Sequence, residues 1–287
     1  MESRLDLTFR ASLAEKAERY EDMMDAMNNI ATLNLWLTVK ERELLSMSYQ
    51  KVATAKLKSL HALTYAELEA QDEGNERHMK MTIEFRHKVE NELDRLCYKV
   101  IDTIDKHLLP YCYDVESKIF YYQMKGDYYR YLAEFKTEPE NSRVIDHSLK
   151  AYENASNIAE KNMSPAHPVR LGVALNISIF YFEMLNSTER ACQHAKQAFE
   201  DALPNLELIG EQLYNKSSSI LQLLMKNLAF WNLNSNMDVD AEHTQDATGR
   251  SDASVDSNMD VGADYTSEHK GESGTSVDTT TCDGDAK

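Results

Sequence analysis

The chain has 287 residues, enough for one large domain or two modest ones, and 42% of them are hydrophobic. Its 48 acidic and 31 basic residues leave a formal net charge of −17, so no nucleic acid is expected as a partner. No apolar run approaches the roughly 18 residues that a membrane span requires, so no membrane insertion is expected either.

The first twenty residues lack the apolar core of a signal peptide, and the four cysteines show no paired spacing. These features predict an intracellular protein, located in the cytoplasm with the nucleus as an alternative. The Asn-x-Ser/Thr matches in the sequence are therefore interpreted as chance.

Apolar residues recur every three or four positions, which is the period of an amphipathic helix. The first predicted helix carries one stripe of Leu5, Ala11, Leu13, Ala14 and Ala17. Further helices are expected over 38–68, opened by the capping box Thr38-x-x-Glu41, and over 83–108, 114–136, 141–162, 167–186, 188–204 and 210–232. About nine helices and no sheet predict an all-α fold with antiparallel neighbours.

The composition changes near residue 232. From 233 onward there are thirteen acids against three bases, and almost no aliphatic residues. Such a segment cannot offset its conformational entropy by burial. We therefore expect a helical domain over 1–232 and a disordered acidic Ser/Thr/Asp-rich tail over 233–287, which acts as a solubilising tail or as a substrate of an acidophilic kinase.

Motifs of catalysis are missing from the sequence. It contains no GxGxxG, no phosphate-binding lysine loop, no HExxH and no GxSxG, and its histidines are isolated. We expect no enzyme, no cofactor and no metal site.

Two kinds of surface could instead bind a partner. At 100° per residue, the segment 115–135 places Gln123, Asp127, Arg130, Tyr131 and Glu134 on one side. An arginine beside a tyrosine and flanked by carboxylates can hold a phosphate or carboxylate group. The same pattern is also that of a solvated, salt-bridged helix face.

The second surface consists of apolar stripes, each interrupted by one asparagine. The stripes are Leu175, Asn176, Ile179 and Glu183 in one segment and Ile220, Leu223, Asn227 and Trp231 in another. Either the asparagines bond to neighbouring helices in the core, or they line a groove and hold the backbone of an extended ligand.

Together these segments resemble the 14-3-3 family of dimeric phosphopeptide-binding adaptors. The matching stretches run in family order across residues 4–232: LAEKAERYEDMMDAM, LTVKERELLS, MKGDYYRYLAEF, HPVRLGVALNISIFYFEMLNS, ERACQHAKQAFEDA and SSSILQLLMKNLAFW. LTVKEREL and IDKHLLP are most similar to the epsilon subgroup. The resemblance implies a nine-helix protomer, a cup-shaped dimer and an amphipathic groove in each half.

In the family pattern, two arginines, a lysine and a tyrosine hold the phosphate. Arg130 and Tyr131 match the second arginine and the tyrosine, whereas the lysine position is Gln50 and the first arginine position is Leu57. Further departures from the family pattern are Thr54, His61, Gln123 and Lys226. Losing two charge-assisted contacts of about 1.5–3 kcal/mol each would weaken phosphate-dependent binding roughly 10²–10⁴-fold. Lys51, Lys56 and Lys58 are close in sequence but project away from the groove positions.

The remaining groove positions match the family better. The resemblance implies that the apolar wall and the backbone clamp consist of Leu175, Asn176, Ile179, Glu183, Ile220, Leu223, Asn227 and Trp231. It also implies a dimer interface of Leu13, Ala17, Arg19, Asp22, Ser59, Leu63, Phe85, Lys88 and Glu92, with Arg19 facing Glu92 and Asp22 facing Lys88 across the two-fold axis.

These matches imply an adaptor that binds phosphorylated or unphosphorylated client segments with a weakened phosphate dependence. The partners would be client proteins and a second 14-3-3 chain, in a homodimer or in a heterodimer with paralogues. The alternative is a regulatory subunit that heterodimerises with ordinary paralogues and lowers their client valency.

Overall fold

The computed structural model describes residues 2–241, with side-chain surroundings through residue 233, and in this range it contains nine α-helices and no strand. The helices are α1 Arg4–Lys16, α2 Tyr20–Ala31, α3 Val39–Asp72, α4 Glu76–Thr103, α5 Val115–Ala133, α6 Glu140–Asn162, α7 Pro168–Glu183, α8 Thr188–Ala202 and α9 Glu211–Ala241. The all-α prediction is confirmed. The expected tail lies outside the described residues from 242 onward, and α9 runs past the predicted boundary at 232.

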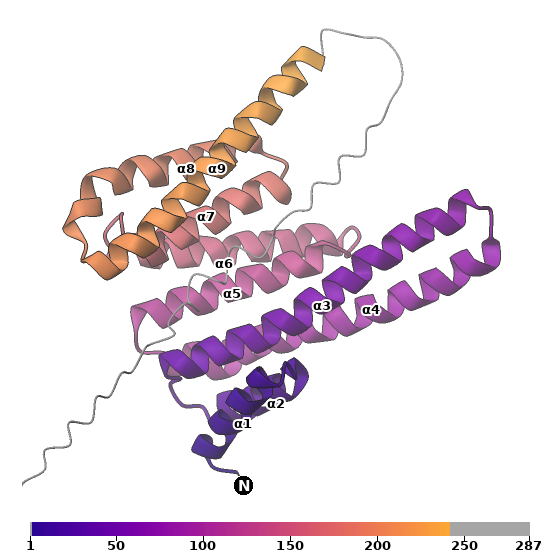
Figure 1. The fold of residues 1–287 in the computed structure, drawn as a ribbon, viewed down its shortest axis with the longest axis horizontal. Helices are drawn as coiled ribbons and strands as arrows, with labels where there is room; N and C mark the ends of the chain where they lie inside the picture. The colour runs from indigo at the N-terminus through magenta and orange to yellow at the C-terminus, as the bar shows by residue number, and fades with distance from the viewer. Residues whose placement is uncertain (1, 242–287) are drawn as a thin grey trace, which may run out of the picture.

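The helices are stacked as antiparallel pairs (Figure 1). The short pair α1–α2 lies against the long pair α3–α4, the pair α5–α6 follows, and α7, α8 and α9 complete the stack. Two apolar clusters fill it, one from α1 to α6 and one from α5 to α9. Because successive helices are antiparallel, alternate helices point the same way.

Several sequence signals specify helix starts. Ser3 and Thr38 both form complete capping boxes, with Asp6 and Glu41 respectively. The predicted box at Thr38 is therefore confirmed. Asp114 caps α5 through the Ser117 amide, which gives this helix a defined start as well.

The predicted stripe of the first helix is wrong in part. Leu5 and Leu13 are exposed, whereas Leu7, Ala11 and Ala14 form the buried side. The helix presents its small residues to the core, so its larger apolar residues are left on the outside.

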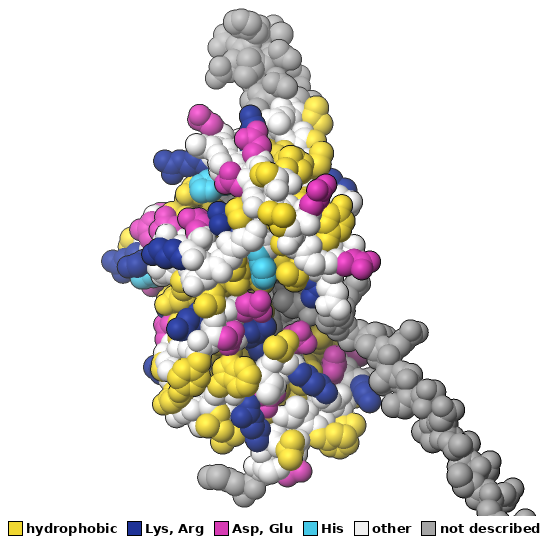
Figure 2. All heavy atoms as spheres, turned by 90° about the vertical axis from the view of Figure 1, so that its left-hand side faces the viewer, with side chains coloured by type: hydrophobic (Ala, Val, Ile, Leu, Met, Phe, Trp, Pro, Cys, Tyr) yellow, Lys and Arg dark blue, Asp and Glu magenta, His cyan; other side chains and the backbone are white. Residues whose placement is uncertain are grey.

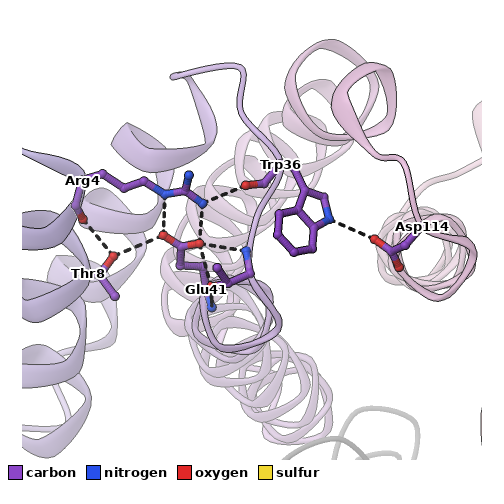
Figure 3. A network of polar contacts seen from close by, with 6 residues as sticks. Arg4, Thr8, Trp36, Glu41 and Asp114 are labelled. Carbon is purple, nitrogen blue, oxygen red and sulfur yellow. Dashed lines mark hydrogen bonds and ion pairs between the residues drawn. The ribbon is translucent and has the colours of Figure 1, made fainter.

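A polar network ties α1 to α3 (Figure 3). Arg4 forms two hydrogen bonds to the Glu41 carboxylate, at 2.7 Å and 2.6 Å, and donates a third to the Trp36 carbonyl at 2.7 Å. The Trp36 indole N–H donates to Asp114 at 3.0 Å. These hydrogen bonds hold the connection between α2 and α3 against the starts of α1 and α5.

Candidate functional site: a groove between alternate helices

The helices α3 and α5 lie side by side and run in the same direction. Arg42 bonds to Ser117 near their starts, the rings of Tyr49 and Tyr128 lie 6.2 Å apart, and further along His61 is 3.2 Å from Glu134. The contacts advance together along both helices, so the two start at one end of the molecule and finish at the other.

The helices α7 and α9 follow the same direction. His167 lies 3.9 Å from Glu116 at the start of α5, and Ser217 donates to the Ala166 carbonyl at 2.6 Å. At the far end the rings of Phe182 and Trp231 stack at 5.3 Å. We call the end where α3, α5, α7 and α9 begin the N-terminal end of the groove; it lies to the left in Figure 1.

A cavity of about 280 Å³ lies between these four helices. Its lining alternates between apolar and polar side chains, which is the amphipathic character that the family resemblance implies. The lining comprises Val39, Arg42, Glu43, Ser46 and Gln50 of α3, Glu116, Phe120, Gln123, Met124, Asp127, Tyr128 and Tyr131 of α5, His167, Pro168, Val169, Gly172 and Asn176 at α7, and Leu213, Lys216 and Ile220 of α9.

Arg130 is not among the residues that line the cavity, but it lies beside Asp127 and Tyr131, which are, and we call its surroundings the Arg130 corner. It is buried at 7% exposure, with its guanidinium 4.9 Å from the centre of the Tyr131 ring. Burial alone lowers the pKa of Arg130, but Tyr152, Tyr131 and the carboxylates of Asp127 and Glu183 outweigh this and raise it. The arginine is therefore charged and surrounded by acceptors that its own protein supplies.

Three carboxylates share this corner. Burial raises the pKa of Asp127, Glu134 and Glu183, and the Arg130 charge opposes that rise in each case. One oxygen of Glu134 and one of Glu183 are buried without a hydrogen-bond partner within the described part of the chain. Arg130 therefore has three carboxyl groups of its own chain around it.

The two replaced phosphate positions contribute no cation. Leu57 is 9% exposed and packs in the first apolar cluster, while Gln50 lines the cavity. Among the neighbouring lysines, Lys51 and Lys58 are exposed, and Lys56 forms an ion pair with Glu92 at 2.8 Å.

The two expected groove asparagines differ in position, since only Asn176 is among the residues that line the cavity. Asn176 is 8% exposed and lines the cavity, and Asn227 is half-buried. Within residues 2–233, neither side-chain amide has a hydrogen-bond partner. Of the other expected wall residues, Leu175, Ile220 and Trp231 are buried, and Ile179, Glu183 and Leu223 are half-buried. Ile220 is the only one of these six that reaches the described cavity lining.

The expected dimer residues lie mostly on one outer face. Leu13, Ala17, Arg19, Ser59, Phe85 and Lys88 are exposed, and Asp22, Leu63 and Glu92 are half-buried. Arg19 pairs with Asp22 inside the protomer, and the Lys88 ammonium lies 5.7 Å from the centre of the Phe85 ring. The predicted partners across a two-fold axis are therefore already engaged within the chain.

Sequence reasoning missed several lining residues, above all Arg42, Phe120 and Lys216. The spacing of 39, 42, 43, 46 and 50 at i, i+3, i+4, i+7 and i+11 could have placed Arg42 on the same helix face as Gln50. No local signal pairs that face with Lys216, which is 174 positions further along the chain.

No described helix is both long and apolar enough to cross a bilayer. Likewise, among residues with a described placement, no three His, Cys, Asp or Glu side chains are grouped to hold a metal ion.

Comparisons with known proteins agree with this geometry. The family model described as "14-3-3 protein" matches residues 10–232. The 14-3-3-like protein GF14-G of Oryza sativa subsp. japonica is 47% identical over 251 residues, covering 88% of this chain and 97% of the relative. The 14-3-3-like protein B of Vicia faba is 48% identical over 246 residues, covering 86% and 94%. The checkpoint signal transducer rad24 of Schizosaccharomyces pombe is 44% identical over 247 residues, covering 86% and 89%.

Proposed function

The chain belongs to the 14-3-3 family, and from that premise we propose a non-catalytic adaptor in signal transduction whose groove holds extended client segments with little dependence on phosphate. Its partners are client proteins, phosphorylated or not, and a second 14-3-3 chain. Its location is the cytoplasm, with the nucleus as the alternative.

One observation carries the weak phosphate dependence: the corner around Arg130 holds one arginine against three carboxylates. Leu57 is buried in the core, and Gln50 is neutral. A phosphate entering this corner would lose its hydration without gaining the cations that replace it. In contrast, the amides of Asn176 and Asn227, which have no hydrogen-bond partner within residues 2–233, support binding of a peptide backbone.

The test is a fluorescence-anisotropy titration of an Arg-x-x-phosphoserine-x-Pro peptide and its unphosphorylated twin against the full chain. We expect less than a tenfold preference for the phosphopeptide. The double variant Gln50→Lys, Leu57→Arg should raise that preference about 10²–10⁴-fold, since each restored contact contributes about 1.5–3 kcal/mol.

The matched control is Lys51→Gln, which removes an exposed lysine next to Gln50 and should leave both affinities unchanged. Because Leu57 is buried, the single variant Gln50→Lys is measured too, with its thermal unfolding. A strong phosphopeptide preference in the unmodified chain would contradict the proposal.

A second candidate function is a regulatory subunit that heterodimerises with ordinary paralogues and lowers their client valency. Two features favour it: positions 50 and 57 carry no cation that could hold a phosphate, and Leu13 and Phe85 remain exposed on the surface expected to form the dimer. Co-purification separates the two functions. Recovery of paralogues alone, unaffected by Asn176→Ala and Asn227→Ala, would favour the regulatory subunit.

A further inference from the structure

Two basic side chains, Arg42 and Lys216, line the N-terminal end of the groove. Four helices, α3, α5, α7 and α9, begin there, and each helix start carries partial positive charge. Figure 2 looks onto the left-hand side of Figure 1, and basic, acidic and hydrophobic side chains are intermixed on that face.

Arg42 is a buried cation at this end. It is 8% exposed, it lines the cavity, and its guanidinium lies 5.1 Å from the centre of the Phe120 ring. It bonds to the Ser117 hydroxyl, while its Nε is buried without a partner. No carboxylate of residues 2–233 lies within the 4.0 Å ion-pair distance of it. Arg42 interacts electrostatically with the Asp114 carboxylate from beyond that distance. An incoming carboxylate would form an ion pair at closer range and offset the cost of burying the guanidinium.

Lys216 faces the same cavity from the opposite wall. It lies in the second turn of α9, is half-buried and forms no ion pair with any residue of the described chain. Glu43 and Glu116 also line this end of the cavity. Neither lies within ion-pair distance of Arg42 or Lys216, and Glu116 lies 3.9 Å from His167.

We propose that the client segment places one acidic side chain, aspartate or glutamate, at the N-terminal end of the groove, between Arg42 and Lys216. This inference rests on the proposed function, because it requires an extended peptide in the groove. It shifts anion recognition from the Arg130 corner to the end where two cations form no ion pair within residues 2–233. The planar guanidinium and the helix starts favour a carboxylate there.

The test uses fluorescein-labelled, unphosphorylated peptides of fifteen residues, with alternating apolar and neutral polar positions and a single glutamate moved along the series. Each peptide has a glutamine twin at the same position. We expect at least one glutamate peptide to bind the full chain about tenfold or more tightly than its twin in low salt, with a smaller difference in high salt.

The variant Lys216→Glu should abolish that preference, which is measured as the ratio of the affinities for the glutamate peptide and its glutamine twin. The control Lys226→Glu makes the same charge change at an exposed position of the same helix outside the cavity lining, and should retain the preference. Circular dichroism melting confirms that both variants fold.

The outcomes separate the two proposals. Equal binding of every glutamate peptide and its twin, or equal losses for both in Lys216→Glu, would overturn the acidic subsite while peptide binding stands. Failure of all these peptides and of the phosphopeptide to bind would overturn the proposed function, and the subsite with it.

Discussion

At the scale of single residues, Gly126 is a position where packing allows no side chain. A Cβ added there would lie 2.7–2.8 Å from the Tyr152 ring, which is fully buried and held by a hydrogen bond to Asp127 at 2.6 Å. The close approach of α5 and α6 brings Tyr152 beside Asp127 and Arg130, so Gly126 helps to assemble the corner of the groove.

We therefore expect Gly126→Ala to lower the free energy of unfolding by about 1–3 kcal/mol, because the buried ring cannot move aside without strain. Gly172→Ala is the matched control, since a Cβ there meets nothing within 4 Å. This control should raise the free energy of unfolding by about 0.5–1 kcal/mol, as alanine does within helices. Urea unfolding at fixed protein concentration measures both, and equal effects would contradict the packing argument.

At the scale of elements, the ion pair between Arg4 and Glu41 joins the start of α1 to that of α3. Glu41 is 4% exposed, and the same carboxylate accepts from the Thr38 amide and hydroxyl in the capping box. One side chain therefore supports a helix start and an interhelix contact at once (Figure 3).

We expect Glu41→Gln to lower the free energy of unfolding at pH 7 by about 1.5–3 kcal/mol, the usual contribution of a hydrogen bond to a charged group. Glu73→Gln, an exposed change just past the end of α3, should alter it by less than about 0.5 kcal/mol. Chemical unfolding followed by circular dichroism compares the two. A Glu41 variant as stable as the control would show that the contact is dispensable.

The same contact predicts a pH dependence. Burial raises the pKa of Glu41, but the hydrogen bonds from Arg4 and Thr38 outweigh it and hold the pKa below the ordinary value of 4.5. The folded state then binds fewer protons than the unfolded state. The stabilisation is complete above pH 4.5 and is lost as the pH falls through the folded pKa. The stability gap between the unmodified chain and Glu41→Gln should shrink over that range.

At the scale of the whole molecule, the outer face of α1 and α4 carries apolar side chains that the protomer leaves uncovered. Leu5, Phe9 and Leu13 follow one another at spacings of four on α1, and Met81 and Phe85 do so on α4. The charged residues near them are already paired within the chain, as Arg19 with Asp22 and Lys56 with Glu92. Apolar burial should therefore supply most of the association energy of the dimer.

We expect Phe85→Asp to shift the dimer toward monomers at micromolar concentration. A two-fold interface contains this residue twice, so the free energy of association should weaken by about 3–6 kcal/mol. This corresponds to a roughly 10²–10⁴-fold higher dissociation constant. Leu208→Asp, at a 79% exposed position far along the chain, is the control. Sedimentation velocity in low and high salt measures both. Dissociation of the unmodified dimer by salt alone would mean that ion pairs dominate.

The sequence by itself determined the helices and the residue types at positions 50 and 57; that these changes weaken phosphate binding stays a prediction. Helical period and the box at Thr38 and Glu41 depend on residues three or four positions apart, and the absence of a cation at Gln50 and Leu57 is a matter of residue type. The family resemblance predicted the same overall architecture from motifs that are contiguous in the chain. The resemblance to the epsilon subgroup stays a prediction.

Only the tertiary structure decided which side chains share the groove. Arg42 and Lys216 face one cavity because α3 and α9 run in the same direction, and that register depends on packing among helices far apart in sequence. The same holds for the tyrosine ring that excludes a side chain at Gly126, and for Lys56, which bonds to Glu92 rather than reaching the groove. Local periodicity specifies the face of each helix, but only side-chain packing specifies what that face meets.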